Sequence, residues 1–178
     1  MIFLLTGESG SGKTTLLNEL VPILSNSGII TGGFTAPGIW ENGKRSGFTL
    51  HDIINKTNYP LAQTSQPGGE MQGRFSFDGN TLSFGNRLLH EQVEDPCIDF
   101  MVIDEVGPME MRGKGWAPAL NKLCSKAKSQ LWVVRPDLVL PVQEKWKFAA
   151  AGIFETVAHD SASVFNVIGS IFNFRKNE

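Results

Sequence analysis

Short, wholly apolar runs recur along the chain and alternate with segments whose apolar residues are spaced as on one face of a helix. An uninterrupted apolar run is typical of a strand in a parallel sheet that helices cover on both sides. We therefore expect an α/β fold of three layers, with a mostly parallel central sheet. The expected strands are Ile2 to Thr6, Phe100 to Ile103, Leu131 to Val134 and Ile153 to Val157, and the expected helices are Lys13 to Ser25, Leu88 to Val93, Trp116 to Ala127, Leu138 to Phe148 and Ser161 to Phe174.

The segment from about residue 29 to residue 84 has a different pattern, in which short alternating runs are separated by turn residues. Asn42-Gly43 and Asp78-Gly79 are pairs favoured in type I′ turns, because both central positions of that turn need a positive φ. The run Gly32-Gly33-Phe34-Thr35 is interpreted in the same way. We expect a small antiparallel β-hairpin insertion here, joined to the parallel sheet. We also expect Ser161 to be the N-cap of the last helix.

Length and charge limit the domain count and the partners. The 178 residues are enough for one sizeable core, so we expect a single domain over residues 1–178. The formal net charge of -2 provides no basic field, which argues against a nucleic-acid partner. No apolar stretch is long enough to cross a bilayer, and the start of the chain lacks the basic flank of a signal segment. We expect a cytoplasmic protein without a membrane partner.

The stretch between the first expected strand and the first expected helix follows the pattern G-x-x-x-x-G-K-T. A glycine loop in that position points backbone N–H groups at one spot, where the helix dipole also favours an anion. Lys13 would reach the β- and γ-phosphates of a nucleotide and assist catalysis, and the Thr14 hydroxyl would ligate Mg²⁺. The predicted nucleotide-binding residues are Gly7, Glu8, Ser9, Gly10, Ser11, Gly12, Lys13, Thr14 and Thr15.

A second candidate site follows the apolar strand Phe100 to Ile103, which leads directly to Asp104 and Glu105. An acid at the end of such a strand can hold Mg²⁺, and we assign that role to Asp104. Glu105 is our candidate for the base that orients and deprotonates a water molecule. The alternative is an acidic turn that caps the next element. Arg135 ends a neighbouring strand and is a candidate for neutralising γ-phosphate charge, or is a surface arginine before Pro136.

These motifs together resemble the small THEP-type nucleoside-triphosphatases, and the resemblance spans most of the chain. It implies a P-loop NTPase fold with an additional strand and a catalytic glutamate. It also implies Mg²⁺-dependent hydrolysis of nucleoside triphosphates such as ATP and GTP to diphosphates, with broad base tolerance. The motifs that carry it are Gly7 to Thr14, Gly33-Phe34-Thr35, Arg45-Ser46-Gly47-Phe48 and Ile103-Asp104-Glu105-Val106-Gly107-Pro108-Met109-Glu110.

The chain departs from that family pattern in two places. The family continues Gly-Phe-x-Thr-Pro-Glu, but here the run Gly33 to Gly38 lacks the acid. The family's Asn-Arg pair near the last strand is absent, and the run Thr156 to Asp160 occupies that region. Contacts to the base therefore cannot be transferred from the resemblance.

Three further residues have open roles. Arg45 is a candidate contact for phosphate or base, or a strand arginine on a solvated face. Trp40 lies beside an expected turn, where it could stack on a base or be one more packing residue. Glu110 follows the acid pair and could orient Glu105 or simply join the following loop.

Two other functions compete with hydrolysis. The first is a nucleotide or nucleoside kinase on the same fold, with an acceptor held over the hairpin insertion. It is disfavoured because the chain has no cluster of lid arginines. The second is a slow nucleotide-dependent switch or assembly factor, for which no protein partner is indicated. A guanine switch is disfavoured because Asn55-Lys56-Thr57-Asn58 and Asn121-Lys122-Leu123-Cys124 both lack the acid of an Asn-Lys-x-Asp run.

Overall fold

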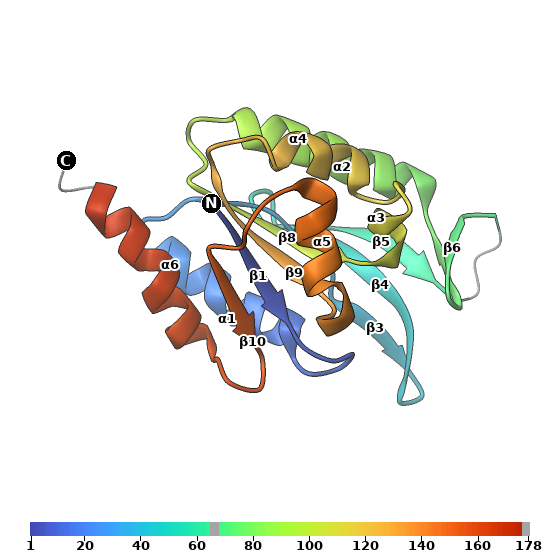
Figure 1. The fold of residues 1–178 in the computed structure, drawn as a ribbon. Coiled ribbons are helices and arrows are strands. Elements are labelled where there is room, and N and C mark those ends of the chain that lie inside the picture. Colours follow the sequence, from blue (N-terminus) through green and yellow to red (C-terminus); the bar gives the residue numbers. More distant parts are fainter. Residues whose placement is uncertain (65–67, 176–178) are drawn as a thin grey trace.

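The computed structural model describes residues 1–64 and 68–175, and within these ranges ten strands form one sheet (Figure 1). The strand order is β10-β1-β9-β8-β2-β4-β5-β7-β6, and β3 pairs with β4. The strands are β1 (Ile2–Thr6), β2 (Thr31–Thr35), β3 (Gly38–Glu41), β4 (Lys44–Asp52), β5 (Thr57–Gln63), β6 (Glu70–Gln72), β7 (Phe75–Phe77), β8 (Phe100–Val106), β9 (Ser129–Val134) and β10 (Gly152–Glu155).

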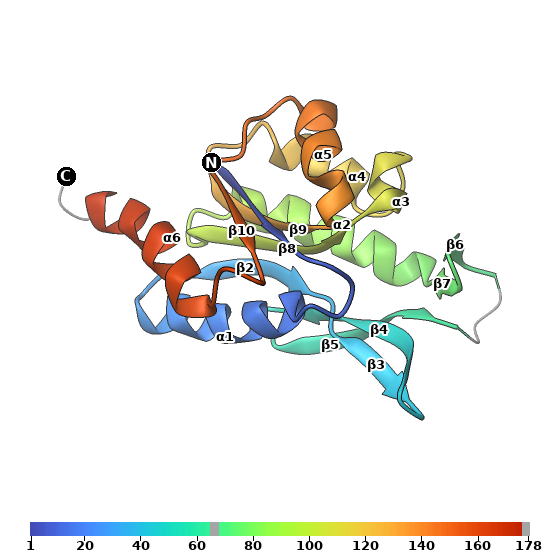
Figure 2. The ribbon, with the colours of Figure 1, turned by 60° about the horizontal axis from the view of Figure 1, so that its bottom comes forward.

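Helices cover the parallel part of the sheet on both faces, as Figure 2 shows, with α1 and α6 on one side and α2 to α5 on the other. The side chains of β1 alternate between the two resulting cores: Ile2 and Leu4 pack under α2, α4 and α5, while Phe3 and Leu5 pack under α1 and α6. The helices are α1 (Lys13–Asn26), α2 (Gly79–Glu94), α3 (Pro108–Met111), α4 (Ala117–Leu123), the 3-10 turn η1 (Pro136–Leu138), α5 (Val139–Trp146) and α6 (Ser161–Arg175).

The five neighbouring strands β10, β1, β9, β8 and β2 run parallel, which confirms the expected α/β class with a mostly parallel central sheet. From β4 onward the pairing is antiparallel. Parallel strands place their carboxyl ends at one edge of the sheet, where ligands of such folds bind. The segments after β1, β8 and β9 therefore meet at this edge.

The hairpin prediction is right at one turn and wrong at another. Asn42 and Gly43 have φ values of 50° and 72° and join β3 to β4, as expected for a type I′ pair. Asp78-Gly79 is no hairpin turn: Asp78 caps α2, because its carboxylate accepts a hydrogen bond of 2.7 Å from the N–H of Thr81. The helix predicted as Leu88 to Val93 is consequently longer and begins at residue 79.

The prediction for the run Gly32 to Thr35 is right in part: β2 pairs antiparallel with β4 through Phe34 and Thr35, but on its other side it pairs in parallel with β8, so it is a strand of the central sheet and not part of a hairpin. Gly33 has a φ of 90°, and a Cβ atom there would lie 1.9 Å from the Val102 carbonyl oxygen, so only glycine fits. The N–H of Gly33 donates to the Gln92 side chain of α2 at 2.6 Å. A contact across 59 residues thus fixes a strand whose local pattern resembles a turn.

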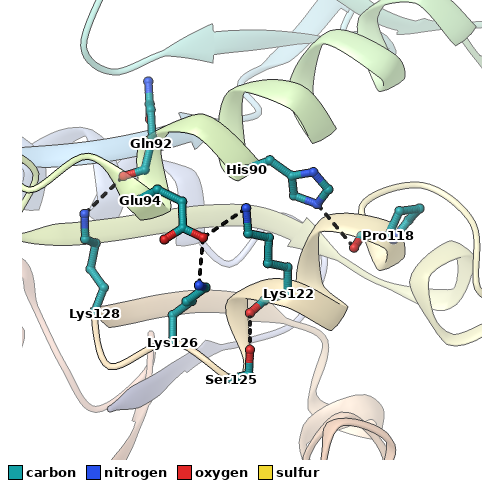
Figure 3. A network of polar contacts seen from close by, with 8 residues as sticks. All are labelled: His90, Gln92, Glu94, Pro118, Lys122, Ser125, Lys126 and Lys128. Carbon is teal, nitrogen blue, oxygen red and sulfur yellow. Dashed lines mark hydrogen bonds and ion pairs between the residues drawn. The ribbon is translucent and has the colours of Figure 1, made fainter.

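A polar network at the carboxyl end of α2 ties this helix to α4 and to the start of β9 (Figure 3). Glu94 pairs with Lys122 at 3.0 Å and with Lys126 at 2.7 Å. Hydrogen bonds from these lysines lower the pKa of Glu94 to about 2. Lys128 donates to the backbone carbonyl of Gln92 at 3.1 Å. The network lies on the surface and joins the end of α2 to the segment between α4 and β9.

The N-cap of α6 is Asp160 and not Ser161. The Asp160 carboxylate accepts a hydrogen bond of 2.8 Å from the N–H of Ser163, and the Ser163 hydroxyl accepts one of 3.0 Å from the backbone N–H of Asp160. Ser161 is the first residue of the helix, and its hydroxyl donates to Glu19. Among residues 1–64 and 68–175, no helix has both the length and the apolar character needed to span a bilayer.

Candidate active site

The glycine loop after β1 bends because its glycines adopt left-handed backbone conformations. Gly10 and Gly12 have φ values of 81° and 90°, and Gly12 immediately precedes α1. The first N–H groups of α1 therefore point out of the sheet edge, where they are free to bind an anion. In this structure the Lys13 ammonium donates to the carbonyls of Gly7 and Glu8. Burial lowers its pKa, although the carboxylates of Glu105 and Asp104 oppose that effect.

The segment after β10 supports the loop through a contact that the sequence did not reveal. The Thr156 hydroxyl donates to the Ser11 hydroxyl at 2.8 Å, across 145 residues. A Cβ atom on Gly7 would lie 2.2 Å from the Thr156 hydroxyl oxygen and 2.4 Å from that of Ser11. Gly7 is therefore needed for this close approach. Thr156 lies in the run where the family's Asn-Arg pair is absent.

The two predicted metal ligands are in contact. The Thr14 hydroxyl donates to the Asp104 carboxylate at 3.3 Å, which joins the start of α1 to β8. Asp104 is 1% exposed and also accepts hydrogen bonds from the N–H groups of Ala36 (2.9 Å) and Glu105 (2.8 Å). Burial raises the pKa of Asp104, and these donors oppose that shift. The loop and the acid pair thus lie at one place.

A bulge in β8 aims Glu105 away from the sheet. The pairing of β8 with β9 shifts register between Ile103 and Val106, and Glu105 has a φ of 57°. This interrupted pairing was not foreseen from the apolar run. Burial and the charge of Asp104 raise the pKa of Glu105 to about 7, and Arg135 and Lys13 oppose the shift. A carboxyl group with this pKa can both accept and release a proton near neutral pH.

A cleft of about 540 Å³ opens in front of the glycine loop. It brings together Lys13, Thr14, Glu105 and Arg135, while Asp104 lies buried beneath it. Its far wall comes from β3, β4 and the β6–β7 hairpin. The sequence assigned these segments to the insertion, and only Trp40 and Arg45 among their residues were considered as possible ligand contacts. The lining residues are Ser9, Gly10, Gly12, Lys13, Thr14, Thr15, Asn18, Pro37, Gly38, Trp40, Arg45, Phe48, Gln72, Gly73, Arg74, Phe75, Phe77, Glu105 and Arg135.

Glu110 is bonded to backbone and fixes the turn that follows β8. Its carboxylate accepts hydrogen bonds from the N–H groups of Gly107 (2.7 Å) and Trp116 (2.9 Å). Burial raises its pKa to about 7, against the effect of these two donors. Of the two roles left open by the sequence, the hydrogen bonds favour a structural one: Glu110 lies in α3 and holds the backbone around this short helix, while its interaction with Glu105 is electrostatic and contributes less to its pKa than burial does.

The donor set at Thr14 and Asp104 fits a magnesium ion. A hydroxyl and a carboxylate are hard oxygen ligands, and Mg²⁺ is held by few protein ligands together with phosphate oxygens and water. Within residues 1–64 and 68–175, no group of three His, Cys, Asp or Glu side chains is placed to form an all-protein metal site. A site that is completed by a phosphate ligand is consistent with this arrangement.

Comparison with known proteins gives a consistent set of relatives. The sequence model of a family described as NTPase matches residues 2–164. A nucleoside-triphosphatase THEP1 of Methanopyrus kandleri is 30% identical over 138 residues, which cover 78% of this chain and 75% of that protein. One of Thermotoga sp. is 28% identical over 179 residues, covering 100% of this chain and 99% of the relative.

Solved structures show the same fold. THEP1 from the hyperthermophile Aquifex aeolicus superposes with a TM-score of 0.65 at 20% identity, over 88% of this chain and 90% of that one. The solution structure of a human cancer-related nucleoside triphosphatase also gives a TM-score of 0.65, at 24% identity, over 86% of this chain and 87% of that one. At this level of identity the likeness concerns the fold alone.

Proposed function

The chain belongs to the NTPase family, and from this premise we propose that it hydrolyses nucleoside triphosphates to diphosphates and phosphate in a Mg²⁺-dependent reaction. The observation that carries the proposal is the contact between Thr14 and Asp104. It joins a phosphate-binding loop to an acidic strand end, which is the arrangement that P-loop enzymes use around a metal-bound triphosphate. The curated relatives are named for nucleoside triphosphates as a class, which supports the acceptance of more than one base.

The chain's own residues have separate tasks in this reaction. The backbone N–H groups of the loop bind the phosphates, and Lys13 exchanges its two carbonyl partners for phosphate oxygens. Thr14 and Asp104 would hold Mg²⁺, which when bound neutralises charge that develops on the phosphates. Arg135 lies at the same cleft and neutralises charge on the γ-phosphate.

Glu105 is the proposed base. Its bulged position places the carboxyl group at the cleft, next to the loop that holds the triphosphate. There it can orient a water molecule for in-line attack on the γ-phosphorus and accept the proton that the water loses. The water oxygen forms the new bond to phosphorus, and the bond between phosphorus and the β–γ bridging oxygen breaks. The diphosphate leaves with that oxygen.

The proposal is tested by measuring phosphate release from ATP, GTP, CTP and UTP with Mg²⁺ and again with a chelator. We expect release from several of these substrates with the metal and its loss on chelation. Lys13→Ala should abolish productive binding of the triphosphate, because the loop then lacks the ammonium group that contacts the β- and γ-phosphates. Lys145→Ala, on the exposed face of α5, is the matched control and should leave the rate unchanged. Equal rates with and without chelator, or in Lys13→Ala, would refute the proposal.

A further inference from the structure

The cleft extends beyond the glycine loop, and its far wall is rich in aromatic rings and arginines. We call this part the hairpin wall; it consists of Trp40, Arg45, Phe48, Arg74 and Phe75. These residues come from the two hairpins β3–β4 and β6–β7. Both views of the ribbon show the β3–β4 hairpin beside the start of α1 (Figures 1 and 2). Hydrolysis as proposed above makes no use of this wall.

Arg45 is held in place by aromatic rings and not by a carboxylate. It lies opposite Trp40 in the β3–β4 pairing, and its guanidinium carbon is 5.0 Å from the centre of the Trp40 ring and 5.2 Å from that of Phe48. Its Nε atom is buried and has no hydrogen-bond partner. A Cβ atom on Gly38 would lie 2.8 Å from this nitrogen, so Gly38 leaves room for it.

Arg74 completes the cationic part of the wall from the second hairpin. Its guanidinium lies 5.1 Å from the centre of the Phe75 ring and donates to the Arg45 carbonyl at 2.8 Å. The β6 strand of this hairpin is in turn tied to the segment around α3. Gln72 accepts a hydrogen bond of 2.7 Å from Arg112, and Glu70 pairs with Lys114 at 2.6 Å.

The cleft has more cations than its carboxylate can balance. Within the described part of the chain, Arg45, Arg74 and Arg135 form no ion pair, and Glu105 is the one carboxylate among the residues that line the cleft. Burial sets the direction of the pKa shifts of Lys13 and Glu105, and the charge of Arg45 acts on both groups. Arg45 therefore lies within electrostatic reach of the reaction site. Arginines in such a setting bind phosphate or carboxylate groups.

Trp40 adds a surface on which a planar group can stack. Its side chain is 59% exposed although it lines the cleft, and Arg45 contacts its ring. Nucleobases stack on exposed tryptophan rings with little dependence on which base it is, because every base has a π-face. An exposed aromatic ring beside two unpaired arginines matches a ligand that combines a base with a phosphate.

In the order of the strands, Glu105 lies between the glycine loop and the hairpin wall. Along the sheet edge the glycine loop follows β1, Arg135 follows β9, Glu105 lies on β8, and the hairpins lie beyond β2. Attacking and leaving oxygens are roughly in line in phosphoryl transfer. If Glu105 orients the attacking group, the rest of the substrate nucleotide lies on the opposite side. A ligand at the wall is then a second molecule.

We propose that the hairpin wall binds a nucleoside monophosphate next to the bound triphosphate, with its base stacked on Trp40 and its phosphate held by Arg45 and Arg74. The inference rests on the proposed function for the position of the triphosphate. It names a second ligand class for the same cleft. Neither the family membership nor the phosphate loop requires such a ligand.

The test is a calorimetric titration in two stages. The protein is first saturated with Mg²⁺ and the β,γ-imido analogue of ATP, and AMP is then titrated into the loaded protein. Adenosine, which lacks the phosphate, and ribose 5-phosphate, which lacks the base, are titrated in parallel. We expect AMP to bind to the loaded protein and each fragment to bind at least tenfold more weakly, because each retains only one of the two contacts.

Variants assign the binding to the wall. Trp40→Ala and Arg45→Ala should each weaken AMP binding about tenfold or more. Trp40 is exposed, so its variant should fold normally. Arg87→Ala, on the outer face of α2 with its guanidinium beside Glu91, is the matched control and should bind AMP like the wild type.

Two results would overturn the inference. One is strict competition between AMP and the analogue, which would mean that the wall receives the base of the substrate itself. The other is unchanged AMP binding in both wall variants. A failure of the proposed function is distinguishable, because it would appear as absent phosphate release, whereas calorimetry measures the binding of the analogue and of AMP independently of hydrolysis.

Discussion

Glu105 combines a strained backbone with the proposed catalytic carboxyl group. Its φ of 57° is a conformation that costs a residue with a Cβ atom roughly 1–2 kcal/mol. The cost is tolerable because the bulge in β8 lifts the side chain out of the sheet and into the cleft. Strain of this kind is common at functional sites, where the surrounding structure holds it in place.

This strain predicts an unusual order of stabilities. The free energy of unfolding of Glu105→Gly should be about 1 kcal/mol larger than that of Glu105→Ala, so the glycine variant is the more stable of the two. Both variants lack the carboxyl group, and only glycine accepts the left-handed conformation without cost. The measurement is urea unfolding of the two variants in the absence of nucleotide. A more stable alanine variant would mean that the backbone at residue 105 is not left-handed.

Asp160 decides where the last helix begins. The reciprocal hydrogen bonds with Ser163 satisfy donors at the start of α6, which packs on α1 through Val164 and Ile168. Asp160→Ala should therefore lower the free energy of unfolding by about 1 kcal/mol. Ser161→Ala is the matched control, because its hydroxyl only donates to exposed Glu19, and it should change stability by less than about 0.5 kcal/mol. Equal losses in the two variants would contradict the assignment of the cap.

Element types were predictable where local signals agree. The glycine loop, the apolar strands and the alternation of strand and helix follow from backbone chemistry and periodicity within short windows. Asp78-Gly79 was misread because the same pair suits a type I′ turn and a helix start. The run around Gly33 was predicted only in part, because its parallel pairing with β8 and its hydrogen bond to Gln92 both involve residues far away in the sequence. Neither ambiguity is resolved by neighbouring residues.

The site was predictable in part for the same reason. The loop and the acid pair lie at strand ends, and a parallel sheet brings strand ends together. The hairpin wall needs two further conditions, the cross-strand pairing of Trp40 with Arg45 and the attachment of β6 to the segment around α3. The contact of Thr156 with Ser11 likewise has no local signal.

Buried carboxyl groups determine how the stability of the whole molecule depends on pH. Glu105 and Glu110 each have a pKa of about 7 in the folded chain, raised from 4.5 chiefly by burial. The folded state therefore holds protons that the unfolded state has already lost. This contribution is complete below about pH 4.5 and is lost as the pH rises through about 7.

Stability without metal and nucleotide should consequently fall between pH 5 and pH 7.5, by up to about 3 kcal/mol for each carboxyl group. The measurement is urea unfolding in the presence of a chelator across this range. Glu110→Gln should flatten the pH dependence, because one of the buried carboxyl groups with a raised pKa is removed. A free energy of unfolding that rises over this interval would contradict the assignment of raised pKa values.

The central claim is that the glycine loop and Glu105 act on one bound triphosphate, the first by binding and the second by catalysis. The most direct test compares the turnover of Glu105→Gln with its affinity for the Mg²⁺ complex of the β,γ-imido analogue of ATP. We predict a turnover lower by a factor of about 10² or more with nearly unchanged affinity, because the amide keeps the shape but cannot accept the proton. Near-normal turnover in this variant would contradict the account.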